Sequence, residues 1–483
     1  MLPNDSIRAP RRLAQYNMLL PGDIEALRAI CPNRVTTGAD IGEDYTRDEM
    51  TEYGKYMPDA LAEPVSTDEV SRLMRFAGER RIPVTPRGSG TGLCGGCVPV
   101  YGGILLSLAK MNRIIEIDTE TLTAVVEPGV LLMDFNKAVA GHGLFYPPDP
   151  GEKSATIGGN AITNAGGMRA VKYGVTREYI LGMEAVLPDG EVIELGGKVV
   201  KNSSGYSLQN LLIGSEGTLA VVTRLTLKLL PQPKYAASLL VPFDNLTECV
   251  GAVPHLLRSF TPTALEFMER EVIEAAEQYL GSRFPDKQSD VYLLLTFDSA
   301  TKAELMHICD AAAEVCIGCK AGDVLISDTE ERQESIWTAR GAFLQAIKGS
   351  TTQMDECDVV VPRNRIAEFV QYSRALSTKY GVRVRSFGHA GDGNLHLYVL
   401  KDQLEDDEWE KRRKAIMDAL YEKARAVEGH VSGEHGIGRA KVDYLTGGIG
   451  ENPIRLMRGI KAVFDPLGIL NPGKVISPIE GDE

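Results

Sequence analysis

Apolar residues recur every three or four positions just after residue 66, and the same stretch then changes to a short apolar run. The recurring apolar positions are Val70, Leu73, Met74 and Ala77. Their spacing predicts an amphipathic helix, and Ser66 with Glu69 has the spacing of a capping box at its start. The run IPVTP, residues 82–86, then predicts a strand that enters the glycine-rich loop 87–92.

Up to residue 232 the pattern is that of short strands separated by many glycines. ILLSL, residues 104–108, and TAVVEPGV, residues 123–130, predict two of these strands. Glycine pairs at 158–159 and 166–167 indicate backbone that is pressed close to a large flat ligand. Tight turns between the strands of a meander are the alternative explanation.

The hydrophobic pattern changes after Pro231 and Pro233, where strand patterns begin to alternate with helical ones. YAASLLVPF, DVYLLLTF and DVVVPR predict strands, and helical patterns follow each of them. This alternation predicts an α+β fold on an antiparallel sheet. The domains expected are 1–232 with an N-terminal extension of about 40 residues, 233–428, and a C-terminal segment 429–483.

The run VRSFGHAGDGNLHLYVL, residues 383–399, carries two histidines on either side of a sharp turn. Asp392-Gly393 favours a two-residue hairpin loop, which would place His389 directly opposite His396. Opposed side chains lie about 4.5–5.5 Å apart at Cβ, close enough for both imidazoles to bind one cation. Two structural histidines in a half-buried sheet are the alternative.

The glycine loop from Arg87 to Gly92 is a candidate phosphate cradle, because glycines let backbone N–H groups converge on an anion. Gly90, Gly92 and Gly95 match GxGxxG. A Rossmann site requires a helix after this motif, but here the chain continues toward a strand. The dipeptide Lys153-Ser154 follows a glutamate, so the P-loop pattern fails as well.

Composition narrows the class of partner. The net charge of -14 argues against nucleic acid and anionic membranes, which need concentrated Lys and Arg. The N-terminus has no apolar core of the signal-peptide kind, and no apolar run is long enough to span a bilayer, so the expected location is cytoplasmic.

Eight cysteines in 483 residues do not predict a disulfide framework. The two CxxC pairs are Cys94-Cys97 and Cys316-Cys319. They lie too far apart in the chain for a zinc ribbon, and a structural role is expected for both, with redox or metal chemistry as the alternative.

A series of motifs, in order along residues 40–476, resembles one family. The motifs are PRGSGTG, PPDP, TIGGN, NAGG, KYGV, GSEGTL, GHAGDGNLH, GEHGIG and DPLGILNPGK. They resemble the FAD-linked D-2-hydroxyacid dehydrogenases of the vanillyl-alcohol-oxidase superfamily, which include D-lactate dehydrogenases, the flavin subunit of glycolate oxidase and D-2-hydroxyglutarate dehydrogenase. The resemblance implies a two-part FAD-binding domain, an α+β cap domain, and a C-terminal helical segment that returns to the flavin.

The resemblance also implies the residues of the site. FAD would be bound noncovalently, because no residue can be assigned as a covalent tether. The expected cofactor-binding residues are Arg87, Gly88, Ser89, Gly90, Thr91, Gly92, Pro148, Thr156, Gly158, Gly159, Asn160, Gly166, Gly167, Tyr173, Gly174, Glu216, Gly217 and Asn471.

One divalent ion, zinc, manganese or iron, would be held by His389, His396 and Glu434, a set that suits such ions. In the mechanism that the resemblance implies, this ion binds the 2-hydroxyl and a carboxylate oxygen of the substrate. His435 then takes the hydroxyl proton, the Cα hydrogen leaves as hydride to flavin N5, and Arg340 clamps the substrate carboxylate.

Three departures from the D-2-hydroxyglutarate enzymes bear on the substrate. Leu344 replaces a threonine, Glu356 aligns with a lysine, and Tyr398 replaces a polar residue. A second substrate carboxylate would lose its partners here, which favours D-lactate first and glycolate next. Residues 199–217 and MRAVKYG resemble lactate dehydrogenases that pass electrons to an electron-transferring flavoprotein; an iron–sulfur subunit, a quinone acceptor and an oligomeric state are also left open.

Other interpretations remain beside this one. A D-2-hydroxyglutarate dehydrogenase is the first, and a flavoprotein of the same fold without hydroxyacid chemistry is the second. The second would not need the histidine hairpin with Glu434. A metal-dependent hydrolase with structural glycine loops would purify colourless. A catalytically silent flavin subunit of a larger electron-transfer complex would tolerate the loss of His435 or of the metal.

Overall fold

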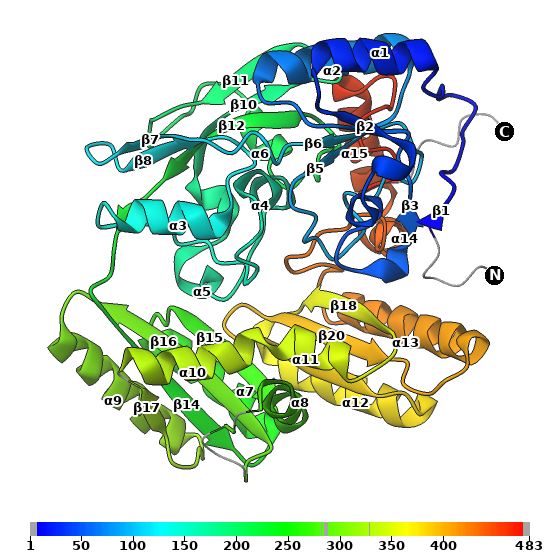
Figure 1. The fold of residues 1–483 in the computed structure, drawn as a ribbon. Helices are drawn as coiled ribbons and strands as arrows, with labels where there is room; N and C mark the ends of the chain where they lie inside the picture. Colours follow the sequence, from blue (N-terminus) through cyan, green and yellow to red (C-terminus); the bar gives the residue numbers. More distant parts are fainter. Residues whose placement is uncertain (1–6, 282, 285–287, 328, 477–483) are drawn as a thin grey trace. The chain divides into compact units, whose positions relative to one another are not determined.

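A computed structural model describes residues 7–281, 283–284, 288–327 and 329–476, and the chain divides into two compact units (Figure 1). The first unit comprises Met1–Ala165, Val175–Gln232 and His435–Glu483, and the second comprises Gly166–Gly174 and Pro233–Glu434. These limits differ from the expected domains in two places, since residues 166–174 and 429–434 group with the second unit.

The core of the first unit surrounds a four-stranded sheet of order β2-β4-β6-β5, in which β4, β6 and β5 are parallel. The strands are β2 (Val35–Thr37), β4 (Ala60–Ala62), β6 (Ile104–Ser107) and β5 (Val84–Arg87). Helices α1 (Pro21–Ile30) and α2 (Thr67–Arg80) pack on each other, and both contribute to the same apolar core as these strands.

Helix α2 forms where the apolar period predicts it. Its predicted apolar face is at most 1% exposed, and Ser66 caps the first turn by accepting a hydrogen bond from Glu69 N at 3.3 Å. The carboxylate of Glu69 bonds Val65 N and pairs with Arg34 instead of returning to Ser66 N, so only half of the capping box is formed as predicted.

A second, antiparallel sheet of the first unit has the order β11-β10-β12-β8-β7. Its strands are β7 (Ile114–Asp118), β8 (Thr123–Val126), β10 (Ile180–Val186), β11 (Val192–Gly196) and β12 (Val221–Lys228). Two-stranded sheets join β1 (Ile7–Arg8) to β3 (Lys55–Tyr56) and β9 (Leu144–Phe145) to β13 (Leu230–Pro231). Between these strands along the chain lie the helices α3 (Leu132–Ala140), α4 (Ile157–Thr163) and α6 (Leu208–Leu212).

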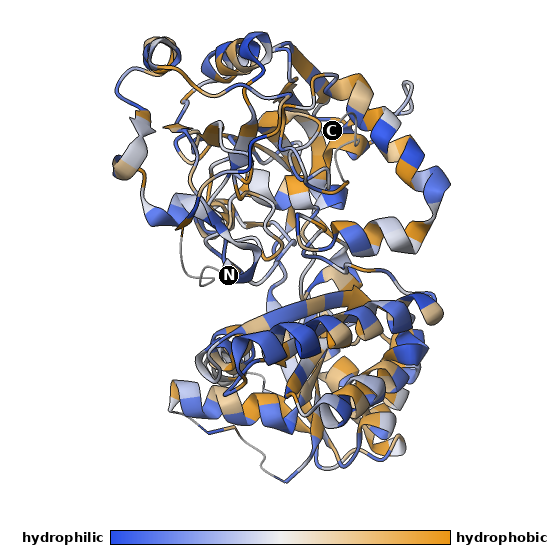
Figure 2. Ribbon diagram, turned by 90° about the vertical axis from the view of Figure 1, so that its right-hand side faces the viewer, coloured by the Kyte–Doolittle hydropathy of each residue, from blue (hydrophilic) through white to orange (hydrophobic). Residues whose placement is uncertain are grey.

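The end of the chain returns to the first unit. After α14 (Val442–Ile449) and α15 (Glu451–Phe464), Leu470 pairs with Val84 in a parallel bridge beside β5. The blue and red ends of the chain consequently lie together in Figure 1. In Figure 2 the helices carry both hydrophilic and hydrophobic positions along their length, as expected for helices that cover a core on one side.

The second unit is built on one antiparallel sheet of order β17-β14-β16-β15-β19-β20-β18. Its strands are β14 (Tyr235–Phe243), β15 (Ala264–Glu269), β16 (Val291–Ser299), β17 (Leu325–Ser327), β18 (Met354–Val360), β19 (Val384–His389) and β20 (Asn394–Leu400). All residues of β20 are buried, so both faces of the sheet are covered there.

Helix contacts divide the helices of the second unit into two groups. One group contains α7 (Leu246–Ser259), α9 (Lys302–Gly318), α12 (Ile366–Tyr380) and α13 (Asp406–Ala426). The other contains α8 (Arg270–Leu280), α10 (Glu330–Gly341) and α11 (Phe343–Gly349), and the short α5 (Ala170–Tyr173) contacts β15. The predicted α+β fold with an antiparallel sheet is confirmed.

The predicted register of the histidine hairpin is wrong. His389 pairs with Asn394, and His396 lies opposite Phe387, so the loop holds the four residues 390–393 instead of two. The shift amounts to two residues along one strand. Because side chains alternate between the faces with a period of two, both histidines still lie on the same face of the sheet.

The longer loop has a local cause and a tertiary one. The expected turn needs a positive φ at both central residues, but only Gly393, at +91°, has one and Asp392 does not. Both of their N–H groups donate to the His389 carbonyl, at 2.9 and 3.2 Å. In addition, Gly391 N donates to Leu265 O of β15 at 3.0 Å, which ties the loop to the neighbouring strand.

Candidate functional site

The three predicted metal ligands come together in the second unit. Glu434 Oε1 lies 3.3 Å from His389 Nε2 and 3.2 Å from His396 Nε2, and the three candidate ligand atoms lie within 4.8 Å of one another. The imidazole planes are perpendicular, with ring centroids 5.3 Å apart. The histidines are 5% and 3% exposed, so a bound ion would be largely shielded from bulk water.

Glu434 is positioned through a buried aspartate. Asp358 of β18 is fully buried and accepts hydrogen bonds from Ser432 Oγ at 2.7 Å and from Gly433 N at 3.2 Å. It also accepts one, at 2.7 Å, from Nδ2 of Asn394, which is the first residue of β20. One carboxylate therefore holds the segment that carries Glu434 against the hairpin that carries the histidines.

The charges in this cluster are strongly coupled. Burial alone would lower the pKa of His389, but the Glu266 and Glu434 carboxylates outweigh it and raise this pKa well above its ordinary value. Burial likewise raises the pKa of Glu434, but His389 and His396 outweigh it and hold this pKa well below its ordinary value. Two imidazole nitrogens and a carboxylate oxygen in a site that favours positive charge fit a divalent cation.

Arg340 is a buried residue with a carboxylate partner. It is 7% exposed at the end of α10, and its Nε and Nη2 donate to Glu266 Oε2 at 3.0 and 2.6 Å. Its guanidinium carbon lies 4.5 Å from the ring centroid of Phe387. The same Glu266 bonds the Nδ1 atom of His389, so the arginine and one candidate metal ligand share a carboxylate.

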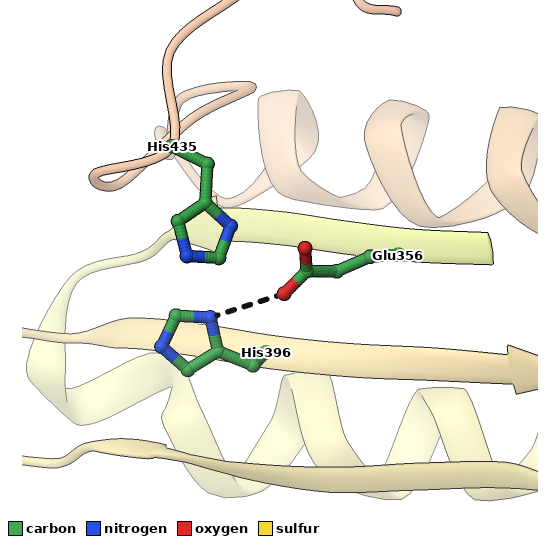
Figure 3. Close-up of side chains that lie close together, drawn as sticks. All are labelled: Glu356, His396 and His435. Carbon is green, nitrogen blue, oxygen red and sulfur yellow. Dashed lines mark ion pairs between the residues drawn. The ribbon is translucent and has the colours of Figure 1, made fainter. Parts of the chain in front are cut away.

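Two of the departures from the D-2-hydroxyglutarate enzymes contact each other. Glu356 and Tyr398 are paired across β18 and β20, and the Tyr398 hydroxyl donates to Glu356 Oε1 at 2.6 Å. Figure 3 shows the ion pair of the same carboxylate with His396 Nδ1, at 3.6 Å. Leu344 is half-buried in α11. An acidic and an aromatic side chain thus stand together beside His396.

His435 follows Glu434 directly in the chain and is half-buried. The turn after it is fixed by Glu216, whose two carboxylate oxygens accept from Ile437 N and Gly438 N at 2.7 Å each. Cys94 Sγ donates to Gly436 O at 3.3 Å. Glu216 was expected at the cofactor, but its carboxylate is used to hold the turn that carries the candidate base.

The glycine loop 87–92 meets the start of α4. A Cβ on Gly88 would lie 2.2 Å from the Thr156 hydroxyl, which caps α4 by accepting from Gly159 N at 3.2 Å. The guanidinium of Arg87 bonds protein backbone, because it donates to the Arg47 and Asp44 carbonyls at 2.6 and 2.8 Å.

The turn 214–217, which carries the predicted cofactor residues Glu216 and Gly217, is joined to the backbone of α4 and to the C-terminal segment. Gly214 N donates to Ala161 O and Glu216 N to Ile162 O, at 3.2 and 2.9 Å. Asn471 Nδ2 donates to the carbonyls of Glu216 and Gly96 at 2.8 and 3.0 Å. The glycine loop, α4, the 214–217 turn and the C-terminal segment thus form one continuous cluster in the first unit.

Three buried polar atoms around this cluster have no hydrogen-bond partner among the described residues. They are Ser107 Oγ, Asn160 Nδ2 and Ser215 Oγ. Ser107 is paired with Arg87 across β5 and β6, and Ser215 lies in the 214–217 turn. Because buried polar groups almost always find a partner, these atoms together with the close-packed glycines fit a polar cofactor such as FAD.

The remaining predicted cofactor residues are distributed between the units. Ser89, Thr91 and Gly92 belong to the loop of the first unit, Gly158 lies in α4, Gly217 in the 214–217 turn, and Pro148 is buried after β9. Gly166, Gly167, Tyr173 and Gly174 belong to the second unit. There the Tyr173 hydroxyl donates to Asp298 Oδ2 at 2.8 Å, and Lys172 forms an ion pair with the same carboxylate.

Sequence reasoning missed Glu266, Asp358 and Asp298. Each is a carboxylate on a strand of the large sheet that fixes another chain segment or side chain. Their only signal in the sequence is an acidic residue inside an apolar run, such as Glu266 in ALEFM or Asp298 in LLLTFD. Such a residue is destabilising in a core unless it is paired.

All eight cysteines are free thiols, as expected for a chain without a disulfide framework. Cys97 accepts a hydrogen bond from Arg87 at 3.1 Å, and Cys316 is buried in α9. In the part of the chain that the structure describes, no helix is both long and apolar enough to cross a bilayer.

Comparison with known families identifies both parts of the chain. Residues 58–196 match the family described as "FAD binding domain", and residues 232–475 match the family "FAD linked oxidases, C-terminal domain". Among solved structures, p-cresol methylhydroxylase with bound substrate is similar with a TM-score of 0.78 at 20% identity, over 95% of this chain and 97% of that one. The likeness in structure confirms the expected vanillyl-alcohol-oxidase type of fold.

Two curated relatives cover nearly the whole chain. A D-lactate dehydrogenase of Anaerostipes hadrus is 49% identical over 467 residues, covering 95% of this chain and 98% of the relative. The glycolate oxidase subunit GlcD of Bacillus subtilis (strain 168) is 40% identical over 442 residues, covering 90% and 92%. The chain therefore belongs to the FAD-linked oxidase family, as an oxidoreductase flavoprotein with its own FAD-binding domain.

Proposed function

We propose that this chain oxidises a small D-2-hydroxy acid, D-lactate before glycolate, to the 2-keto acid. The observation that carries the proposal is the buried cluster of His389, His396 and Glu434, which fits a divalent ion. The names of the two relatives agree with a hydroxy-acid substrate. When bound, FAD supplies a two-electron acceptor and the divalent ion supplies Lewis acidity.

The protein residues bind the substrate and move one proton. The substrate loses its hydroxyl proton and its Cα hydrogen with an electron pair. His435 accepts the hydroxyl proton, because an imidazole is a competent base near neutral pH. Arg340 binds the carboxylate, for which its guanidinium fork is well suited. The phenyl ring of Phe387, under the guanidinium, keeps this fork in a fixed plane.

The substrate is a monocarboxylate in this proposal. A second carboxylate, as in 2-hydroxyglutarate, needs a cationic partner, but Glu356 and Tyr398 stand beside His396. The Glu356 carboxylate would repel a second negative charge in a site of low dielectric constant. An external acceptor would take the two electrons from FAD, and we propose an electron-transferring flavoprotein for this role on the resemblance of residues 199–217.

The test is a visible spectrum of the purified protein, followed by anaerobic addition of D-lactate before and after chelation. We expect a bound flavin that D-lactate bleaches, a loss of bleaching after chelation, and recovery with a divalent ion. Glycolate should bleach more slowly, and D-2-hydroxyglutarate should not bleach the flavin. A flavin that none of these acids reduces would overturn the proposed reaction, and bleaching that survives complete metal removal would overturn the role of the ion.

A further inference from the structure

Glu266 lies at the centre of the second unit and has two different partners. It is the third residue of β15, is fully buried, and faces the end of β19. Its Oε1 atom is 2.6 Å from His389 Nδ1, and its Oε2 atom accepts from Arg340 Nε and Nη2 at 3.0 and 2.6 Å. Each carboxylate oxygen therefore serves one functional side chain.

The bond to His389 selects the nitrogen that can bind a metal. A neutral imidazole has one N–H group, and a carboxylate acceptor at Nδ1 holds the hydrogen there. The lone pair is then on Nε2, the atom 3.3 Å from Glu434 Oε1. A partner of this kind orients the ring and increases the basicity of the ligand nitrogen.

The bond to Arg340 orients the guanidinium in the same way. Two parallel N–H groups on one oxygen fix the plane of the fork, and the rings of Phe387 and Phe343 lie 4.5 and 5.5 Å from its carbon atom. Removal of the Glu266 charge would leave a buried arginine without its counter-ion, which is strongly unfavourable.

The second histidine is held differently. Glu356 is 3.6 Å from His396 Nδ1, beyond hydrogen-bond distance, and its Oε1 atom already accepts from Tyr398. Glu356 therefore gives His396 an electrostatic partner, whereas Glu266 gives His389 a short hydrogen bond. The two carboxylates are not equivalent, because Glu266 bonds both His389 and Arg340.

We propose that Glu266 is a positioning residue that couples the metal site to the carboxylate-binding arginine, by fixing the Nδ1–H form of His389 and the plane of Arg340 with one carboxylate. This inference rests on the proposed function, because it takes His389 as a metal ligand. It adds a residue that acts only through other side chains and does not itself contact substrate or ion.

The experiment compares Glu266→Gln with Glu269→Gln in the full-length, FAD-loaded protein after metal removal. Glu269 is the matched control because it is a buried glutamate of the same strand, paired with Arg374 at 2.8 Å and with Ser386 instead of the cluster. The affinity for Zn²⁺ is measured by competition with a chromophoric chelator, and thermal unfolding of the metal-free protein reports folding.

We expect Glu266→Gln to bind Zn²⁺ about 10–100-fold more weakly and to raise the KM for D-lactate, while Glu269→Gln binds Zn²⁺ like the wild type. Equal Zn²⁺ affinity of Glu266→Gln and wild type would overturn the inference and leave the proposed function intact. A wild type that binds no Zn²⁺, Mn²⁺ or Fe²⁺ would instead overturn the metal site itself.

A second variant covers the case in which Glu266→Gln does not fold. Glu266→Asp keeps the charge that Arg340 requires but is one methylene shorter, so it no longer reaches both partners. We expect a folded protein with weakened Zn²⁺ binding and an unchanged flavin spectrum. Wild-type Zn²⁺ affinity in a folded Glu266→Asp protein would contradict the positioning role.

Discussion

The two units differ in the kind of contact that builds their candidate sites. The first unit brings backbone close to backbone: a Cβ on Gly158 would lie 2.5 Å from Pro128, and one on Gly438 would lie 2.1 Å from Cys94 O. The candidate metal site of the second unit is instead built from contacts between charged groups, with Glu266 on β15 and Asp358 on β18 both fully buried. Added atoms should therefore damage the first unit, and removed charges should damage the second.

The largest effect is expected from removal of a candidate metal ligand in the second unit. His389→Ala removes one of three donors and leaves Glu266 without its histidine partner. We expect metal affinity to fall by more than the roughly 10–100-fold that outer partners of a ligand contribute, with loss of D-lactate oxidation. FAD content, measured by the visible spectrum, should not change, because His389 is not among the residues expected to bind FAD, most of which belong to the first unit. Loss of the flavin as well would break the comparison.

Lys474 tests how one buried charge of the first unit affects stability. It is 2% exposed and donates to Val98 O at 2.8 Å, and burial lowers its pKa from 10.5 to about 8. Between these two pH values the unfolded chain binds a proton that the folded chain does not, so this lysine makes stability rise with pH in that window. As the pH falls from 10.5 to about 8, this lysine lowers the free energy of unfolding by up to about 3 kcal/mol.

Replacement of this lysine by methionine should remove that pH dependence. We expect the difference in unfolding free energy between wild type and Lys474→Met to change between pH 8 and pH 10, in favour of the wild type at the higher pH. Chemical denaturation at both pH values measures it. A difference that stays constant would mean that Lys474 is charged throughout, and that the first unit also tolerates a buried charge.

The close packing of the first unit is tested by one added methyl group. Gly158→Ala places a Cβ against Pro128 in helix α4, where neither backbone can move aside easily. We expect a loss of about 1–3 kcal/mol of unfolding free energy and weaker FAD binding, with Zn²⁺ affinity unchanged. Gly22→Ala in α1 is the control, because a Cβ there has no atom within 4 Å. Equal effects of both substitutions would contradict a steric role for Gly158.

The same difference explains what the sequence could predict. The period of Val70, Leu73, Met74 and Ala77 is a local signal, and the predicted helix is confirmed. The glycines of the first unit form motifs for the same reason, since a close approach of backbone needs glycine at that position. Fold class and family could therefore be inferred from short segments of the chain.

The buried charges could not be predicted in this way. Glu266 acts on His389 and Arg340, which are 123 and 74 residues away in the chain. The hairpin register also depends on a distant contact, from Gly391 N to Leu265 O. In both cases the deciding partner is on β15, whose sequence ALEFME consists largely of helix-forming residues. Strand pairing, not propensity, determines the structure there.

The smallest effect is expected from removal of the hydrogen bond between Tyr398 and Glu356. Tyr398→Phe removes the donor to Glu356 but keeps the ring that stacks on Phe387, with centroids 5.6 Å apart. We expect a loss of about 1–2 kcal/mol of unfolding free energy and a Zn²⁺ affinity within a factor of a few of wild type, because Glu356 is only an electrostatic partner of His396. Urea unfolding and chelator competition measure the two quantities. If Tyr398→Phe weakened Zn²⁺ binding as strongly as Glu266→Gln, both histidines would depend equally on their carboxylates, and the asymmetry between Glu266 and Glu356 would be wrong.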